Sequence, residues 1–225
     1  MKSKHRHLAI IPAREGSQGF KHKNRLFFNL TADFLDTISW FDGVIVSTND
    51  PIVTEYAEKK NYSIHHRDND LSGPDVSIKK VFTNVVEENK LEADYILWLF
   101  YLPILFKNKS DFLGAKQIIE QKEVRSLCSF IPANIHPFNC WKLNGDTNKL
   151  EQYIPNNIFR RQDLPEAWMH YHYLCCLKVS ELPSLNSELI NEKTWPIFLN
   201  RETVDQLIEI DTPEDYKKWK RMRNE

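Results

Sequence analysis

The segment LAIIPAREGSQGFKHKN, residues 8–24, contains the residue types that bind phosphate groups. An apolar run stops at Pro12, and the following loop holds two of the chain's 6 glycines, Gly16 and Gly19. Glycine lets the backbone adopt positive φ angles and approach a ligand closely, and successive N–H groups in such a loop form an anion-binding concavity. Three basic residues flank these glycines: Arg14, Lys21 and Lys23. The pattern indicates a polyphosphate site, but on spacing alone a plain strand-to-helix loop with solvated cations explains it equally well.

A second candidate group is the carboxylate pair Glu209 and Asp211 in IEIDTPEDY. On an extended segment, residues two apart face the same side, so the pair suits a shared hard cation. The simpler interpretation is an acidic strand end before the last helix, where carboxylates are favourable in any case. Taken alone, the pair favours this simpler interpretation, because acidic pairs are common on surfaces.

The histidines give a weaker signal. His170 and His172 precede Cys175 in HYHYLCCLKV, and one strand face could present all three to a transition metal. No fourth ligand stands at a suggestive spacing, so a partly buried aromatic strand is the preferred interpretation. The tandem His65-His66 points to opposite faces of its strand and suggests no catalysis.

Alternating strand and helix signals must position these residues. Strands are predicted at LAIIPA, GVIVST, SIHHR, YILWLF and SLCSFI. Helices are predicted at 51–60, with Asp50 as N-cap, and at 76–89 and 110–122. The alternation predicts an α/β fold: a mostly parallel, Rossmann-like sheet with helices on both faces.

The pattern changes after about residue 138. CWKLNGDTNKLEQY predicts a hairpin with a type I′ turn at Asn144-Gly145. NNIFRRQDLPEAW is polar and irregular and predicts a projecting arm, HYHYLCCLKV predicts a strand, and the last helix starts after Thr212. We therefore expect one domain over 1–225, with 138–180 as a hairpin and arm insertion.

Composition excludes some classes of function. The 225 residues contain 30 Lys plus Arg and 31 Asp plus Glu, for a net charge of -1, which does not support binding to nucleic acid or an anionic membrane. No apolar run approaches the ~20 residues that span a bilayer, and LAII is too short for a signal-peptide core. The 4 cysteines show no CxxC spacing, so we expect a reduced, cytoplasmic protein.

The amino-acid sequence of the loop is a more specific signal than the spacing of its glycines. IIPAREGSQGFKHKN resembles IPARxGSKGxxxKN, the signature of the acylneuraminate cytidylyltransferases, which activate sialic acids and related sugars. VIVSTNDPIVTEYAEKKNYSIHHRDNDLSGPDVS resembles the family's second strand, its helix and its RPxxLxxDxxS segment. FRRQDLPEAW resembles its RQDLP element and IEIDTPEDY its IDIDxxxD motif. Four matches in the family's order make chance a poor explanation.

The resemblance implies that a sugar's anomeric hydroxyl attacks the α-phosphorus of CTP, so that pyrophosphate leaves and a CMP-sugar forms for a surface polysaccharide. The implied nucleotide-binding residues are Ala13, Arg14, Gly16, Ser17, Lys23, Asn24, Arg67 and Ser77. The implied catalytic residues are Arg14, Lys23 and Asp211, and the implied Mg²⁺ ligands are Glu209 and Asp211. The arm implies a homodimer in which Arg161 and Gln162 reach the acidic sugar in a neighbouring site.

Four departures from the family pattern qualify these implications. Gln18 replaces a lysine, which Lys21 could compensate, and only residues 25–42 separate Asn24 from the next strand. LFYLPILFK replaces LQPTSPLR, and HYHYLCC replaces an NGAIY-like strand. An apolar sugar side would leave substrate hydroxyls unpaired, which argues against sialic acid itself. The alternative function is a catalytically impaired homologue that binds nucleotide or serves as a scaffold; an enzyme for eight-carbon lipopolysaccharide sugars fits GSxGxxxKN and RQDLP less well.

Overall fold

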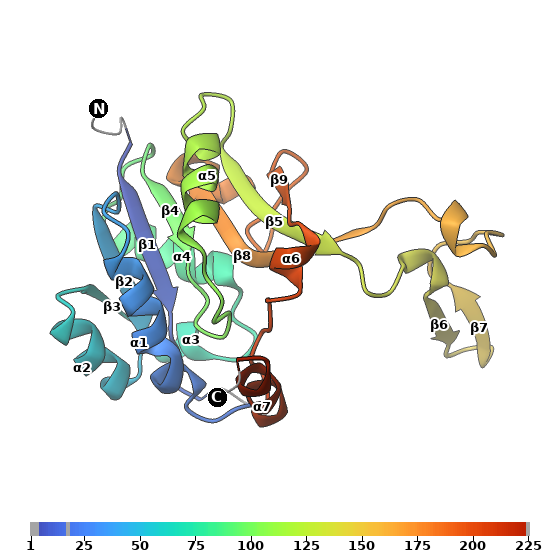
Figure 1. The fold of residues 1–225 in the computed structure, drawn as a ribbon, viewed down its shortest axis with the longest axis horizontal. Helices are drawn as coiled ribbons and strands as arrows, with labels where there is room; N and C mark the ends of the chain where they lie inside the picture. The colour runs from blue at the N-terminus through green and yellow to red at the C-terminus, as the bar shows by residue number, and fades with distance from the viewer. Residues whose placement is uncertain (1–4, 17–18, 224–225) are drawn as a thin grey trace.

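The computed structural model describes residues 5–16 and 19–223. Its centre is a seven-stranded sheet in the order β3-β2-β1-β4-β8-β5-β9 (Figure 1). The strands are β1 (His7–Pro12), β2 (Gly43–Thr48), β3 (Ser63–His66), β4 (Ile96–Leu99), β5 (Ser126–Pro132), β8 (Trp168–Lys178) and β9 (Trp195–Phe198). β8 runs antiparallel to both of its neighbours, and the other pairs are parallel. The predicted mostly parallel α/β sheet is confirmed.

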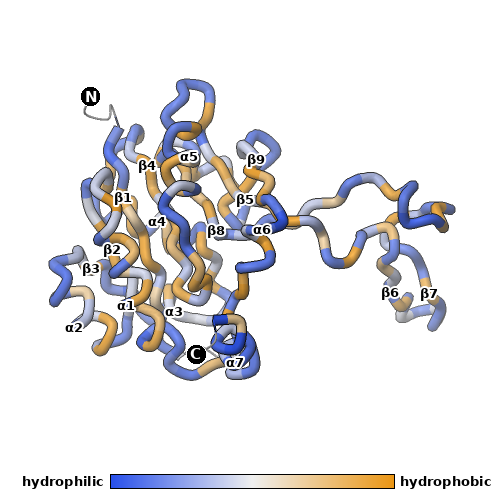
Figure 2. Tube along the Cα trace, in the orientation of Figure 1, coloured by the Kyte–Doolittle hydropathy of each residue, from blue (hydrophilic) through white to orange (hydrophobic). Residues whose placement is uncertain are grey.

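Alternation along the strands builds one hydrophobic core on each face of the sheet. Ala9 and Ile11 of β1 pack with α1 (Lys23–Asp36), α2 (Pro51–Lys59), α5 (Lys109–Ile119) and α7 (Pro213–Met222). Leu8 and Ile10 face the other way and pack with α4 (Ile78–Glu88) and the 3-10 segment η3 (Val179–Ser184). Figure 2 shows the hydrophobic residues concentrated along the central strands. Two short helices complete the body: α3 (Asn69–Ser72) and α6 (Arg201–Val204).

Side-chain caps fix where the helices begin. Asp50 accepts a hydrogen bond from the Ile52 N–H, and Thr212 forms a reciprocal capping box with Asp215, so both predicted N-caps are confirmed. α4 starts at Ile78 instead of residue 76, because the Ser77 hydroxyl caps it by accepting from the Lys80 N–H. The short connection after Asn24 is one helix, α1, which begins at Lys23 itself.

The predicted hairpin forms from β6 (Trp141–Asn144) and β7 (Lys149–Gln152), but the prediction of a type I′ turn is wrong. Four residues lie between Asn144 and Lys149, and within them the positive φ of 51° falls on Asn148, not on Gly145. A type I′ turn needs positive φ at both central residues. Instead, the Asn144 side-chain oxygen accepts from the N–H groups of Asp146 and Thr147, which stabilises a longer loop.

The hairpin lies at the end of a long arm that projects from the sheet (Figure 1). Two 3-10 turns belong to the arm, η1 (Pro137–Asn139) and η2 (Arg161–Asp163). The arm ends earlier than the predicted boundary at residue 180, because β8 lies inside the main sheet between β4 and β5. Within the described part of the chain, no helix is both long and apolar enough to cross a membrane.

Candidate nucleotide-binding site

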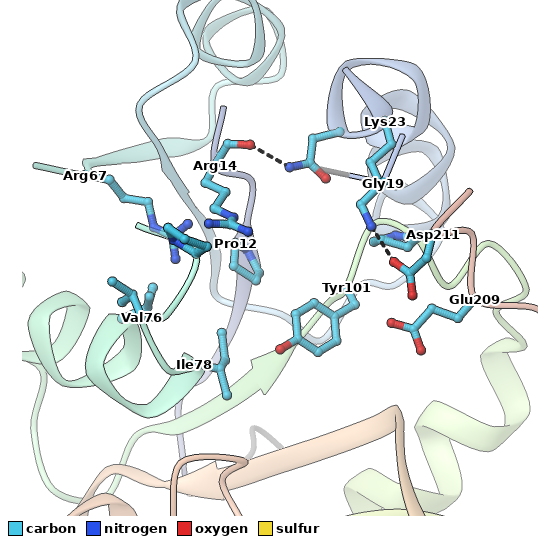
Figure 3. A pocket seen from close by; sticks show the side chains of 14 residues that line it. Pro12, Arg14, Gly19, Lys23, Arg67, Val76, Ile78, Tyr101, Glu209 and Asp211 are labelled. Atoms are coloured by element: carbon cyan, nitrogen blue, oxygen red, sulfur yellow. Dashed lines mark hydrogen bonds and ion pairs between the residues drawn. The ribbon is translucent and has the colours of Figure 1, made fainter. Parts of the chain in front are cut away.

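The loops after β1, β3 and β4 and the segment before α7 enclose a cavity of about 430 Å³. Parallel strands of open α/β sheets bring ligand-binding loops together at this carboxyl edge. Figure 3 shows two charged groups in the cavity: Arg14 and Arg67 on one side, and Lys23, Asp211 and Glu209 on the other, with Tyr101 between them. The cavity therefore offers binding groups for both an anion and a cation.

The arginine side is a concentration of uncompensated positive charge. Arg67 follows β3, and its backbone N–H donates to the Thr48 carbonyl at 3.0 Å. Its side chain is half-buried, and its buried Nε has no hydrogen-bond partner among the described residues. Burial, together with the charge of Arg14, lowers the pKa of Arg67 to about 10. Arg14 donates to the Ser72 carbonyl at 3.3 Å. Neither guanidinium forms an ion pair with a carboxylate of the described residues, which fits a ligand that brings its own negative charge.

On the other side of the cavity, Asp211 forms an ion pair with the first residue of α1. Lys23 Nζ donates to Asp211 Oδ1 at 2.5 Å (Figure 3). The segment before α7 is anchored to the loop after β4, because the Ile210 N–H donates to the Pro103 carbonyl at 3.0 Å. Desolvation in the cavity and the charge of Asp211 raise the pKa of Glu209, although Lys23 opposes this. Paired carboxylates whose repulsion raises a pKa, with hard oxygen donors, fit a divalent cation such as Mg²⁺.

The two glycines have different roles. Gly16 has a φ of +80° and open space around its Cα, as expected for a tight turn. Gly19 has no positive φ, which corrects the expectation that both glycines would adopt this conformation. A Cβ on Gly19 would overlap the backbone carbonyl of Asp211. Gly19 therefore lets the loop and the segment carrying Asp211 approach closely. Ser17 and Gln18 lie outside the described residues.

Several predicted residues support the loop instead of lining the cavity. The buried Ala13 donates its N–H to the Ser47 carbonyl at 2.9 Å and accepts from the Thr48 hydroxyl at 2.6 Å. Asn24 lines the cavity and also donates from Nδ2 to the Arg14 carbonyl at 2.8 Å, which fixes the loop. Ser77 caps α4 and is not a lining residue, nor is the exposed Lys21. Arg14, Lys23, Asn24 and Arg67 thus meet at the cavity, together with Glu209 and Asp211.

The loop after β4 corrects the expectation of an apolar sugar side. Phe100 stacks on Phe112 with ring centroids 5.1 Å apart, and Leu102 is fully buried in the same core. Tyr101 points the opposite way and lines the cavity, where its ring contacts His172 at 5.4 Å. Extended backbone alternates its side chains, so only the middle residue of the three faces the cavity, and it carries a hydroxyl.

Other lining residues were not among the predicted site residues. Pro74, Val76 and Ile78 form an apolar wall before and at the start of α4. Arg161 and Gln162 lie on the exposed η2 turn of the arm, away from the cavity (Figure 1). Arg161 lines a separate hollow within the arm. The chain's own cavity is therefore built without the two predicted sugar contacts.

Comparison with solved structures identifies the fold of this chain. The chain is similar to a CMP:2-keto-3-deoxy-manno-octonic acid synthetase complexed with CTP, with a TM-score of 0.65, 14% identity and coverage of 97% of this chain and 98% of that one. It is also similar to the 4-diphosphocytidyl-2C-methyl-D-erythritol synthase of Anaerococcus prevotii DSM 20548, with a TM-score of 0.58, 14% identity and coverage of 98% and 97%. The fold is that of the cytidylyltransferases.

The sequence adds a particular resemblance. The chain is 23% identical over 165 residues to the N-acylneuraminate cytidylyltransferase of Streptococcus agalactiae serotype V (strain ATCC BAA-611 / 2603 V/R). The match covers 70% of this chain and 40% of that protein, so the chain spans about 40% of the relative's length. No protein-family model matches. The resemblance stated from the motifs, to a divergent cytidylyltransferase of this kind, is confirmed.

Proposed function

We propose that this chain is a cytidylyltransferase that transfers CMP from CTP to an acidic keto-sugar. The observation that carries the proposal is the half-buried Arg67, whose buried Nε has no hydrogen-bond partner among the described residues, beside Arg14 and across one cavity from Glu209 and Asp211. A triphosphate supplies the anion that the arginines lack, and its metal partner supplies a divalent cation that Glu209 and Asp211 would share. The motif order supports cytidine as the base.

The reaction forms a bond between the anomeric oxygen of the sugar and the α-phosphorus. The bond from this phosphorus to the bridging oxygen breaks, pyrophosphate leaves, and the sugar hydroxyl loses its proton. Catalysis of this kind is mainly positioning and charge neutralisation. In the proposal, Arg14, Lys23 and Arg67 bind the phosphate oxygens, and Asn24 keeps the loop in shape through the Arg14 carbonyl. The close approach at Gly19 keeps the carboxylates beside Lys23.

In the same proposal, Glu209 and Asp211 hold Mg²⁺. When bound, the ion neutralises phosphoryl oxygens and orients the triphosphate. Asp211 would then exchange part of its contact with Lys23 for the metal, which frees the ammonium for a phosphate. The raised pKa of Glu209 fits this role, because the carboxylate pair is unfavourable without an added cation.

An acidic sugar of the sialic acid kind is the proposed acceptor. The Tyr101 hydroxyl faces the cavity, and the nearby Tyr171 hydroxyl is buried without a partner among the described residues. Both suit a hydroxyl-rich substrate, since a buried polar group that is paired only on binding contributes to specificity. We further propose a cytoplasmic homodimer in which the arm brings Arg161 and Gln162 to the neighbouring site.

Pyrophosphate release from CTP, measured with a panel of eight- and nine-carbon keto-sugar acids with and without Mg²⁺, tests the proposal. We expect release with at least one acceptor, a CMP-sugar by mass spectrometry, and no release with ATP. CTP at about 100 times its dissociation constant should add about 2.7 kcal/mol of stability. CTP binding without turnover by any acceptor would favour the impaired homologue. Neither binding nor turnover would reject the nucleotide site.

A further inference from the structure

Behind Tyr101, three metal-binding side chains converge from two strands. The ligand atoms of Cys128 on β5 and of His172 and Cys175 on β8 all lie within 4.8 Å of one another. All three side chains are buried, and both thiols are free. The sequence contained only a weak metal signal at His170, His172 and Cys175, and Cys128 is distant in the chain and joins the cluster only through strand pairing.

An irregularity of the sheet creates the cluster. Cys128 and Cys175 are direct partners across the antiparallel β5 and β8, but the next pair is Ser129 with Tyr171. Residues 172–174 of β8 are therefore extra within the ladder. Bulges of this kind redirect side chains and are frequent next to functional sites. Here the bulge places the His172 ring beside the two thiols.

The chemistry of the cluster suits zinc. His172 Nε2 is 2.9 Å from the Glu188 carbonyl oxygen. In the tautomer that donates this hydrogen bond, Nδ1 keeps its lone pair, and metal-bound histidines are commonly held by such a bond to a backbone carbonyl. Zn²⁺ with two thiolates and a neutral imidazole has no net charge, so the complex avoids the cost of burying an unpaired charge.

We propose that Cys128, His172 and Cys175 bind one Zn²⁺ ion, which joins β5 to β8 behind the cavity wall formed by Tyr101. His170 and Glu188 form a separate group with His172 inside the same 4.8 Å limit and are not part of the group that holds the two thiols. The cluster therefore supplies three of the four ligands of a tetrahedral site. The ion would hold the His172 ring against Tyr101. This role is structural and does not depend on the proposed transferase activity.

Metal analysis of the reduced chain tests the proposal directly. After dialysis against excess Zn²⁺ and then against buffer, we expect one retained zinc per chain by inductively coupled plasma mass spectrometry. Titration with Co²⁺ should give the visible bands of a tetrahedral ion and a near-ultraviolet charge-transfer band from two thiolates. Lack of retained metal would overturn the proposal. A bound Co²⁺ without the thiolate band would also overturn it, because the ion would then sit on His170, His172 and Glu188.

Adjacent cysteines provide a matched pair of variants. Cys175 and Cys176 are equally buried, but Cys176 packs in the core on the opposite face of the sheet. We expect Cys175→Ala to lose stoichiometric zinc and Cys176→Ala to keep it. Equal retention by the two variants would contradict the assignment. If circular dichroism shows that Cys175→Ala is unfolded, the cobalt spectrum of the unmodified chain decides alone.

Discussion

Arg67 is a half-buried positive charge next to a second arginine, Arg14. Its pKa is lowered to about 10 by burial and by Arg14, so the charged form is disfavoured in the folded chain. The guanidinium is charged at neutral pH both folded and unfolded, and the folded state alone bears the penalty. We therefore expect Arg67→Gln to raise the stability of the ligand-free protein by about 1–2 kcal/mol, with allowance for partial exposure.

The same substitution should weaken CTP binding roughly 10- to 100-fold, since a hydrogen bond to a charged group contributes about 1.5–3 kcal/mol. Chemical denaturation and isothermal titration calorimetry measure the two effects. Arg201→Gln is the control, because Arg201 is 93% exposed on the short α6. Loss of stability together with unchanged CTP affinity would show that Arg67 is structural.

Glu209 predicts a pH dependence with a definite sign. Its pKa is raised in the folded protein, mainly by desolvation and by Asp211, so the folded state binds this proton more tightly than the unfolded state. Without a metal, the group's contribution to stability is therefore lost as pH rises through the raised pKa. Binding of Mg²⁺ instead requires Glu209 to be deprotonated, because only the carboxylate is a ligand.

We expect Mg²⁺ affinity to fall on acidification at a pH above that of an ordinary glutamate. Glu209→Gln should weaken Mg²⁺ binding and remove this pH dependence, and it should stabilise the metal-free chain at neutral pH. Titration calorimetry and denaturation across a pH series check both statements. Glu214→Gln serves as the comparison, because Glu214 is an exposed residue of α7. A pH profile that is the same in both variants would contradict the role of Glu209.

At the scale of single residues, the sequence predicted which residue types form the site, but not the direction in which each side chain points. The motifs identified Arg14, Lys23 and Arg67, which do line one cavity. They could not show that Phe100 and Leu102 enter the core while Tyr101 faces the cavity. That choice depends on the exact residue at which β4 ends, because a shift by one residue exchanges the two sides.

At the scale of elements, the site depends on two segments that meet at Gly19. The loop after β1 and the strand-like segment before α7 approach so closely that a side chain at Gly19 would overlap the Asp211 carbonyl. We expect Gly19→Ala to destabilise the fold by about 1–3 kcal/mol, as overpacking does, and to reduce turnover because Asp211 is displaced from Lys23. Urea denaturation and pyrophosphate release measure the two effects.

Substitutions at two other glycines distinguish the steric overlap at Gly19 from the general effect of replacing a glycine. Gly114 lies inside α5 with open space around it, so Gly114→Ala should stabilise the chain by about 0.5–1 kcal/mol. Gly16→Ala has room but keeps a strained positive φ, and we expect a cost of about 1 kcal/mol. If Gly19→Ala behaved like Gly114→Ala, the close approach would not constrain the site.

The order of the elements was predictable because hydrophobic period, caps and turn residues agree locally along most of the body. The N-caps at Asp50 and Thr212 are examples. The position of β8 between β4 and β5 could not be predicted, because strand order and antiparallel pairing arise from contacts between distant segments. For the same reason, Cys128 could not be joined to Cys175 from the sequence.

At the scale of the whole molecule, the arm is too apolar for a free surface. Exposed large hydrophobic residues gather on it: Ile135, Trp141, Leu143, Leu150, Tyr153, Ile154 and Phe159. Phe159 is 91% exposed. Clustered apolar surface of this kind marks an interaction site, and burial contributes about 25 cal/mol per Å². The proposed partner is a second copy of the chain.

We expect a dimer by size-exclusion chromatography with light scattering, and a shift toward monomer in Phe159→Glu. Leu113→Glu is the matched control, because Leu113 is 46% exposed on α5 of the body. The dimer should survive this change. A monomeric native chain, or equal dissociation in both variants, would contradict an arm-mediated dimer.

A mixing experiment tests whether the subunits share their sites. If Arg161 acts on the neighbouring cavity, homodimers of Arg14→Ala and of Arg161→Ala are both inactive. In the mixed dimer, the subunit that carries Arg161→Ala keeps its own Arg14 and receives the intact Arg161 of its partner. One of its two sites is then complete, so co-refolding the variants should restore up to half of the native rate per mixed dimer. If Arg161 acted within its own chain, no mixed dimer would hold a complete site, and activity would stay at the level of the variants.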